Sequence, residues 1–232
     1  MISGSAYNYE YLNMIGHGSY GIVYKACDKR TGQIVAMKEE FNGLSTPTLR
    51  EIAILKSLPQ HPAIVGFKEV VRDDWDRVFV VMEHVENDLA RFMAARRQPL
   101  RPNEVKCMMK QLLEGVKFLH ENGVMHRDLK PSNILINKKG DLKICDFGSS
   151  FQERSDVEQR TKIYTILGRA KPDDNLFIRK FLEAAVISGV PLLTGLGFDL
   201  LKKLLEYDPE KRITAEAALN HGWFKESDPY FF

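Results

Sequence analysis

Three glycines near the N-terminus have the spacing of a loop that can bind phosphate. Residues 16–23 match the pattern Gly-x-Gly-x-x-Gly-x-Val through Gly16, Gly18 and Gly21. A dinucleotide-binding fold would continue with a helix, whereas residues 22–27 have the composition of a strand. We therefore expect a β-hairpin whose backbone N–H groups can approach phosphate oxygens, because glycine has no Cβ. Alone, the pattern is equally that of an ordinary glycine-rich hairpin.

A lysine and a glutamate follow at positions that also suit phosphate chemistry. Lys38 ends the apolar run at residues 35–37. A lysine at the end of a buried strand holds its ammonium at a fixed place, suitable for the α- and β-phosphates of a nucleotide. Glu51 lies in a short helical segment that opens at Pro47, within reach of Lys38 if the helix packs on the sheet. Taken singly, each charge is more simply explained as a solvated surface residue.

The segment from His126 to Asn133 is far more specific, because eight fixed positions (His-Arg-Asp-Leu-Lys-Pro-Ser-Asn) seldom recur by chance. In a phosphoryl-transfer site, Asp128 would accept or orient the proton of a substrate hydroxyl, and Lys130 would lie near the γ-phosphate. Asn133 would bind Mg²⁺. Asp146, which opens the motif Asp-Phe-Gly, would bridge that ion to the phosphates. The ordered set of motifs therefore predicts catalysis with ATP and Mg²⁺.

Strands dominate the first third of the chain, and helices the rest. Runs of β-branched and aromatic residues predict strands over residues 10–40, and the apolar run at 78–82 predicts a buried strand. A single apolar face predicts a helix from Asn103 to Asn122, with Asn103 as its N-cap and Gly123 directly after its end. The tail at 198–224 is predicted to be helical, with Thr214 capping its second piece. The fold class is therefore α+β, with two lobes.

Composition excludes several classes of protein. The 33 basic and 31 acidic side chains give a net charge of +2, which argues against a nucleic-acid-binding function. The three cysteines show no Cys-x-x-Cys spacing, so neither a disulfide framework nor a zinc site is expected. No apolar run approaches the ~20 residues of a membrane span, and the N-terminus does not resemble a secretory signal. We expect an intracellular protein without nucleic-acid or membrane partners.

With these motifs in hand, the chain resembles the eukaryotic protein kinase family from about Tyr9 to Gly148. Lys130 is typical of serine/threonine kinases, and Thr46–Glu51 is similar to the PITSLRE helix of cyclin-dependent kinases, which packs on a cyclin. The resemblance implies a bilobal kinase-like fold over residues 1–232, with a β-rich N-lobe at about 1–85 and a helical C-lobe at about 86–232. It further implies a protein substrate, a cyclin partner and a location in the nucleus or cytoplasm.

The resemblance also assigns the residues that would surround a nucleotide. Ser19 and Tyr20 match inhibitory phosphorylation sites of the subfamily's glycine loop. Met82 would lie behind the adenine, and the backbones of Glu83 and Val85 would hydrogen-bond the base. The side chains expected to line the adenine pocket are Ile15, Val23, Ala36 and Leu135.

The resemblance fails after Ser150. The sequence has neither the Ala-Pro-Glu that ends an activation segment nor the Asp-x-Trp-x-x-Gly of the core helix that follows. Instead, Phe151 begins a stretch similar to the opening of the next helix, so roughly 60 residues of the usual kinase layout are expected to be missing, leaving a truncated C-lobe. A second, shorter excision is expected near Asp174-Asn175. Arg212 is then expected to lack its usual glutamate partner, and Arg50 and Arg127 the phosphothreonine that they would bind.

This departure leaves one alternative alignment and three possible functions open. Residues 164–173 faintly match a threonine-to-Ala-Pro-Glu stretch, which would make Thr161 or Thr165 an activating phosphosite, but the match needs an insertion and an Asp in place of Glu. With the segment after Ser150 missing, the chain would be one of three things. It would be an impaired serine/threonine kinase, a catalytically dead module that binds ATP or a cyclin, or a non-functional product of splicing or gene prediction.

Overall fold

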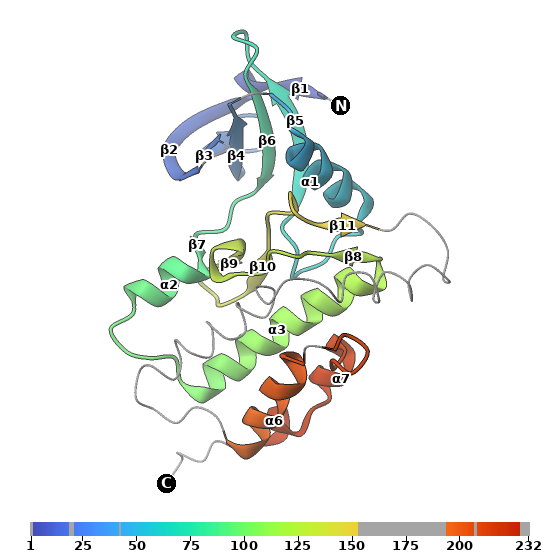
Figure 1. The fold of residues 1–232 in the computed structure, drawn as a ribbon. Helices are drawn as coiled ribbons and strands as arrows, with labels where there is room; N and C mark the ends of the chain where they lie inside the picture. The colour runs from blue at the N-terminus through green and yellow to red at the C-terminus, as the bar shows by residue number, and fades with distance from the viewer. Residues whose placement is uncertain (1, 19–20, 42, 153–193, 207, 228–232) are drawn as a thin grey trace.

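A six-stranded sheet forms the upper part of the molecule in Figure 1, and helices form the lower part. The computed structural model describes residues 2–18, 21–41, 43–152, 194–206 and 208–227. The strand order in the sheet is β1-β5-β6-β4-β3-β2, and a short 3₁₀ helix (Ala6–Asn8) links the first two strands. The strands are β1 (Gly4–Ser5), β2 (Tyr9–Gly18), β3 (Gly21–Asp28), β4 (Ile34–Glu40), β5 (Phe67–Arg72) and β6 (Val78–Glu83).

Alternation along β4 decides which side chains face the helical part. Val35 and Met37 are fully buried in a cluster on the far face of the sheet, together with Phe79. Because successive side chains on a strand point to opposite faces, Ala36 and Lys38 project from the other face. At Gly21, the first residue of β3, the backbone passes very close to the backbone of β4. A Cβ at this position would lie 1.7 Å from the carbonyl oxygen of Glu39. The hairpin therefore requires glycine at this position.

Helix α1 (Thr46–Ser57) lies beside the sheet in Figure 1, and Glu51 is one of its buried residues. Ser45 caps its N-terminus by accepting a hydrogen bond from the backbone N–H of Thr48. Pro47 lies in the first turn, where the missing N–H costs nothing. Ile52 is almost fully buried in the main core, so the helix is held by apolar packing as well as by its cap. This confirms the predicted helical segment opening at Pro47.

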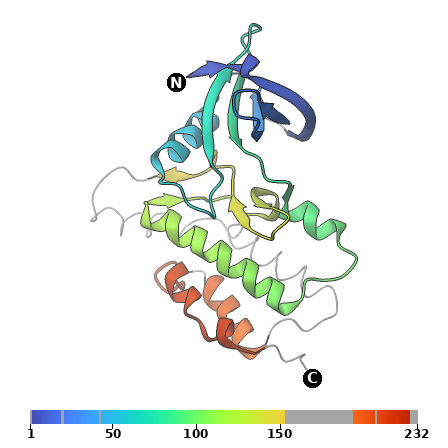
Figure 2. The same ribbon diagram turned by 180° about the vertical axis from the view of Figure 1, so that it is seen from behind.

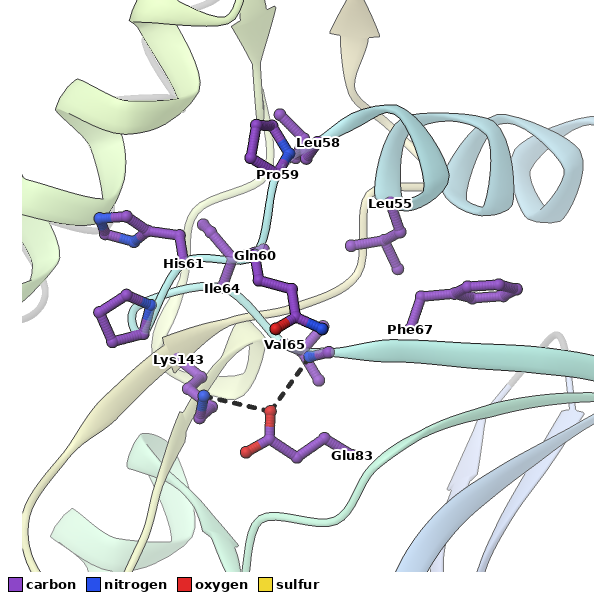
Figure 3. Close-up of a pocket in the computed structure, with 12 residues that line it drawn as sticks. Leu55, Leu58, Pro59, Gln60, His61, Ile64, Val65, Phe67, Glu83 and Lys143 are labelled. Atoms are coloured by element: carbon purple, nitrogen blue, oxygen red, sulfur yellow. Dashed lines mark hydrogen bonds and ion pairs between the residues drawn. The ribbon is translucent and has the colours of Figure 1, made fainter.

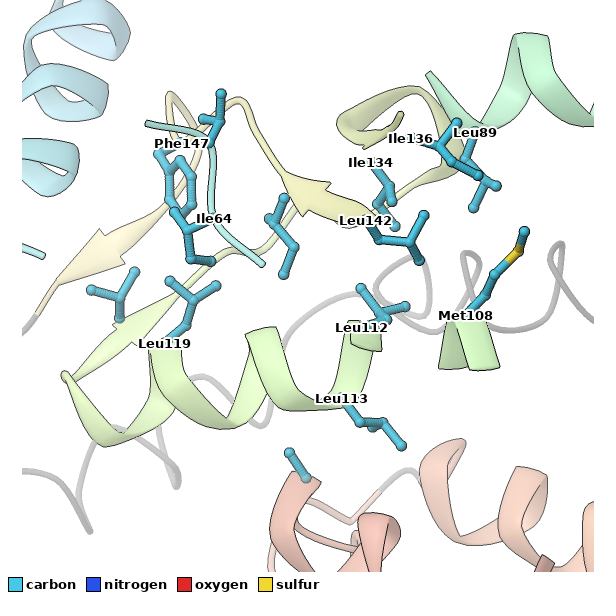
Figure 4. Packing of buried hydrophobic residues seen from close by; sticks show 14 of the residues in the cluster. Ile64, Leu89, Met108, Leu112, Leu113, Leu119, Ile134, Ile136, Leu142 and Phe147 are labelled. Atoms are coloured by element: carbon cyan, nitrogen blue, oxygen red, sulfur yellow. The ribbon is translucent and has the colours of Figure 1, made fainter. Parts of the chain in front are cut away.

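The lower part is organised around the long helix α3 (Pro102–Glu121), as Figure 2 shows from behind. The buried face of α3 includes Met108, Leu112 and Leu119, which pack against residues of β9, β10 and Phe147 (Figure 4). The other elements are β7 (Asn87–Asp88), α2 (Leu89–Ala95), β8 (Val124–Met125), a 3₁₀ turn (Pro131–Asn133), β9 (Ile134–Ile136), β10 (Leu142–Ile144), β11 (Phe151–Gln152), α6 (Gly195–Leu204), α7 (Ala215–Leu219) and a 3₁₀ turn (Gly222–Lys225). The α+β fold is therefore confirmed.

Both predicted ends of α3 can be compared with the structure. Gly123 follows the helix with φ of +69°, as predicted for a terminating glycine. The N-cap prediction was wrong, because the helix begins one residue before Asn103, at Pro102, and the cap position is Arg101. Glu104 accepts a hydrogen bond from the Arg101 N–H at 2.7 Å. Thr214 caps α7 as predicted, by accepting from the Ala217 N–H.

The chain after the Asp-Phe-Gly motif continues as a strand. Phe151 and Gln152 form β11, which pairs antiparallel with Met125 and Val124 of β8. This differs from the sequence-based placement of Phe151 at the opening of a helix. The cause lies in Ser150, whose hydroxyl donates to the carbonyl of His126 and keeps this segment beside β8.

Several sequence-based expectations fall outside the described residues, namely those for Ser19, Tyr20, Thr161, Thr165 and Asp174-Asn175. Arg212 donates through Nε to the backbone carbonyl of Glu206 at 2.8 Å, which leaves the expectation about its usual glutamate partner untested. Among the described residues, no helix combines the length and apolar character needed to cross a membrane.

Candidate active site

Lys38 and Glu51 form a buried ion pair between β4 and α1. The ammonium Nζ of Lys38 lies 3.0 Å from Oε2 of Glu51, which is only 2% exposed. Burial acts to lower the pKa of Lys38, but the carboxylates of Glu51, Glu40 and Asp146 outweigh it and raise that pKa. Burial raises the pKa of Glu51, and Lys38 opposes this effect. Lys38 is therefore held as a cation at the inner face of the sheet.

Glu51 also contacts the Asp-Phe-Gly motif. Its second oxygen, Oε1, accepts a hydrogen bond from the backbone N–H of Phe147 at 3.3 Å. Phe147, directly after Asp146, is fully buried in the main hydrophobic core. Asp146 has φ of +66°, a left-handed conformation that L-residues rarely adopt and that is often found at functional sites. One glutamate thus links the lysine to the predicted metal ligand.

The predicted catalytic loop folds back on Asp128. Lys130 Nζ lies 2.8 Å from Asp128 Oδ2, and Asn133 Nδ2 donates to the same oxygen at 3.0 Å and to the Asp128 carbonyl at 2.9 Å. Asn133 is nearly buried, whereas Asp128 and Lys130 are partly open to solvent. Because the Asn133 amide nitrogen is used in this way, its Oδ1 oxygen is left to coordinate a cation.

His126 connects the catalytic loop to the strand segment before Asp146 through both of its ring nitrogens. Its Nδ1 accepts from the Asp128 N–H at 3.3 Å, so the ring proton resides on Nε2, which donates to the Cys145 carbonyl at 2.9 Å. Burial lowers the pKa of His126, and the ring is therefore neutral. The imidazole also packs edge-on against Phe147. These contacts connect the loop that bears Asp128 to the strand that leads to Asp146.

Two arginines bind the segment that follows Asp146. Arg50 of α1 donates to the carbonyl of Gly148. Arg127 donates through Nε to the carbonyl of Ser149 at 2.7 Å. Each guanidinium group therefore binds a backbone carbonyl. In the family that the chain resembles, these two arginines would bind a phosphothreonine.

The residues expected to contact adenine lie on β2, β3, β4, β6 and β9 and in the segment that follows β6. Ala36 of β4 is paired in register with Met82 of β6, which is largely buried, and Val85 is 8% exposed. Glu83 uses its N–H for the Gly66 carbonyl, at 2.7 Å. Gly16 lies opposite Val23, and Gly18 opposite Gly21, across the β2–β3 hairpin. The remaining predicted lining residues, Ile15, Val23, Ala36 and Leu135, are all partly buried.

Some contacts at this site were not predicted. Arg91 of α2 donates to the Ile15 carbonyl at 2.8 Å and so joins the glycine hairpin to the helical part. Glu40 approaches Lys38, and its position two residues further along the strand was the available signal. Glu83 binds Lys143 at 3.1 Å with its side chain, in the wall of a cavity of about 480 Å³ (Figure 3).

Comparisons with known proteins agree with this geometry. The family model described as "Protein kinase domain" matches residues 9–170. The chain is 39% identical to Cyclin-dependent kinase G-1 of Oryza sativa subsp. indica over 297 residues, which cover 94% of this chain and 42% of that protein. It is 34% identical to Cyclin-dependent kinase 11B of Rattus norvegicus over 306 residues, which cover 98% of this chain and 69% of that protein. The chain thus spans less than half of the rice relative.

The family match covers residues 9–170, which is more than half of the chain. The chain belongs to the protein kinase family. Within that family, it is related to the cyclin-dependent kinases of the G and 11 types.

Proposed function

We propose that the chain is an ATP-dependent serine/threonine kinase of the cyclin-dependent class, which transfers the γ-phosphate of ATP to a protein hydroxyl. The observation that carries this proposal is the continuous set of contacts from Lys38 through Glu51 and Phe147 to the turn at Asp146. Protein kinases need both the Lys–Glu ion pair and the Asp of Asp-Phe-Gly in place for phosphoryl transfer. In this chain the Lys38–Glu51 ion pair is connected to the residue after Asp146 by the hydrogen bond from the Phe147 N–H to Glu51.

In this proposal Asp128 positions the acceptor hydroxyl and takes its proton. Lys130, 2.8 Å from Asp128, holds a positive charge beside the transferred phosphoryl group. Lys38 binds the α- and β-phosphates, and the backbone of Gly16, Gly18 and Gly21 covers them. The side chains of Ile15, Val23, Ala36 and Leu135 contact the adenine, and the backbones of Glu83 and Val85 hydrogen-bond it.

Asn133 and Asp146 suit a Mg²⁺ ion. Both offer side-chain oxygens, and Mg²⁺ is usually bound by one or two protein groups together with phosphate oxygens. The free Oδ1 of Asn133 supports this assignment, since its Nδ2 is committed to Asp128. The ion would neutralise charge on the phosphates.

We infer a cyclin as partner, bound through the Thr46–Glu51 helix. Two large apolar side chains support this inference, since Leu49 on α1 is 37% exposed and Phe41, just before it, is 50% exposed. The protein substrate and a nuclear or cytoplasmic location are proposed on the names of the relatives alone.

We also infer that the segment ending in Ala-Pro-Glu and the following core helix are missing from this chain. The absence of both motifs supports this inference, as does an alignment with the rice relative that runs over 297 residues although the chain has 232. An activation segment normally presents the substrate peptide. This observation favours a second candidate function, namely ATP or cyclin binding without phosphoryl transfer. A non-functional splice or gene-model product would bind neither.

The test is transfer of labelled γ-phosphate to a mixture of protein substrates, with and without added cyclins. Asp128→Asn should abolish transfer, because the amide cannot accept the hydroxyl proton. Asp76→Asn is the matched control, because it makes the same chemical change at an exposed side chain in a distant turn. Asn tolerates the φ of +65° that Asp76 has there. Undiminished transfer by Asp128→Asn would refute the assignment. Binding of Mg-ATP without any transfer would support the second candidate instead.

A further inference from the structure

Glu40 carries a buried carboxylate beside Lys38, although no recognised motif contains it. It is the last residue of β4, two positions after Lys38, so both side chains lie on the same face of the strand. Only 4% of Glu40 is exposed. Its Oε1 lies 3.2 Å from Lys38 Nζ, and its Oε2 accepts a hydrogen bond from the Thr48 hydroxyl at 2.6 Å. A carboxylate this deeply buried requires such partners.

The hydroxyl groups at the start of α1 are ordered toward Glu40. A carboxylate paired with Lys38 can only accept, so Thr48 spends its single hydroxyl proton on Glu40. Ser45 Oγ, 2.8 Å from Thr48 Oγ1, must then be the donor in that contact, while it accepts from the Thr48 N–H. Thr48 is only 2% exposed. The first turn of α1 is therefore tied to the end of β4 by a polarised, buried chain of hydrogen bonds.

Lys38 lies between carboxylates from two different elements. It makes a directed hydrogen bond to Glu51 of α1 at 3.0 Å and an electrostatic contact with Glu40 of its own strand. The hydrogen bond to Glu51 uses one of the three donors of the Lys38 ammonium, which leaves donors for a phosphate. The two carboxylates together restrict where the ammonium can lie.

We propose that Glu40 and Thr48 are positioning residues, which hold α1 against β4 and thereby keep Lys38 and Glu51 in contact. Only five residues separate β4 from α1, so the Glu40–Thr48 contact closes a short loop. The inference rests on the proposed function, because it concerns the ion pair that phosphoryl transfer uses.

The first experiment measures hydrogen exchange of the isolated full chain, without nucleotide or cyclin. Thr48→Val keeps the shape of the side chain but removes the donor to a buried carboxylate. We expect amides at residues 49–57 to exchange about tenfold faster, because α1 opens more often. Amides of α3 should keep their protection, which distinguishes a local effect from general unfolding. Thr48→Ser restores the donor and should exchange as the wild type does.

The second experiment reads the charge of Lys38 directly. Glu40→Gln removes a neighbouring negative charge, and Lys38 should then react about tenfold faster with acetic anhydride, as measured by peptide mass spectrometry. Glu10→Gln, an exposed change on β2, is the matched control. Combining Thr48→Val with Glu40→Gln should change the exchange of α1 no more than the larger single effect, because both act through one contact.

Wild-type exchange of α1 in Thr48→Val, or wild-type acylation of Lys38 in Glu40→Gln, would overturn the proposal. Neither measurement requires catalysis. A chain that shows both effects but transfers no phosphate would therefore refute the proposed function and leave the positioning role intact. A chain whose phosphate transfer depends on Asp128 but that shows neither effect would support the proposed function and refute the positioning role of Glu40 and Thr48.

Discussion

Replacing Lys38 with methionine leaves two buried carboxylates without their cation. Glu51 and Glu40 are 2% and 4% exposed, and Lys38 lies 3.0 Å and 3.2 Å from them. Removing one partner of a buried ion pair costs about 3–5 kcal/mol. Glu40 keeps its bond from Thr48, and Glu51 keeps the N–H of Phe147. We therefore expect the lower end of that range, about 3 kcal/mol of unfolding free energy at pH 8.

The destabilisation should shrink in acid. Burial raises the pKa of Glu51 even beside Lys38, and removing the cation raises it further. A carboxyl whose pKa is higher in the folded than in the unfolded chain takes up a proton on folding, so its contribution to stability is present at low pH and is lost as the pH rises. The deficit of Lys38→Met relative to the wild type should thus fall to about 1 kcal/mol near pH 5.

The assay is urea unfolding followed by circular dichroism at several pH values between 5 and 8, without nucleotide. Lys138→Met, an exposed change in the β9–β10 turn, is the control and should stay close to the wild type at every pH. A deficit below about 1 kcal/mol at pH 8, or one that does not change with pH, would show that the two carboxylates do not depend on Lys38.

Three other substitutions have expected outcomes that urea unfolding can measure. Gly21→Ala should lower the unfolding free energy by about 1–3 kcal/mol, because its Cβ would meet the Glu39 carbonyl. Phe147→Ala should cost about 3–5 kcal/mol, because the ring is fully buried. Burial lowers the pKa of His126, so the unfolded chain binds a proton that the folded chain does not, and wild-type stability falls as the pH drops below about 6.5. That fall should be shallower in His126→Gln.

Much of the architecture was predictable because it follows from local periodicity. The apolar run that became β6 is buried on both faces, and the apolar stripe of α3 faces the core, as its spacing requires. The pairing of Lys38 with Glu51 was also predictable, since a helix that opens at Pro47 places the glutamate one turn inside it. In each case a short segment contained the whole signal.

The remaining differences arose where two local signals competed or where the contact was distant. Asn103 is a good capping residue, but Pro102 fits the first helical position and Glu104 closes the turn onto Arg101, and this combination determined the boundary. Phe151 continues as a strand because Ser150 and β8 hold it there, and sequence similarity contains no information on that contact.

The contact between Glu40 and Thr48 had no signal in the sequence, whereas the spacing of Glu40 from Lys38 along β4 was a signal for their contact. Glu40 belongs to no motif, and its role depends on a hydroxyl eight residues away, on another element.

Within the described residues, the contacts of the proposed nucleotide site lie between residues 15 and 152. Arg50 and Arg127 bind the carbonyls of Gly148 and Ser149, so the segment after Asp146 is fixed to α1 and to the catalytic loop without a phosphate group. The proposed binding of Mg-ATP therefore uses residues that lie outside the segment inferred to be missing. Transfer to a protein needs in addition a surface that presents the substrate. A chain that binds nucleotide but transfers nothing would place the defect in that surface and not in the phosphate-binding residues.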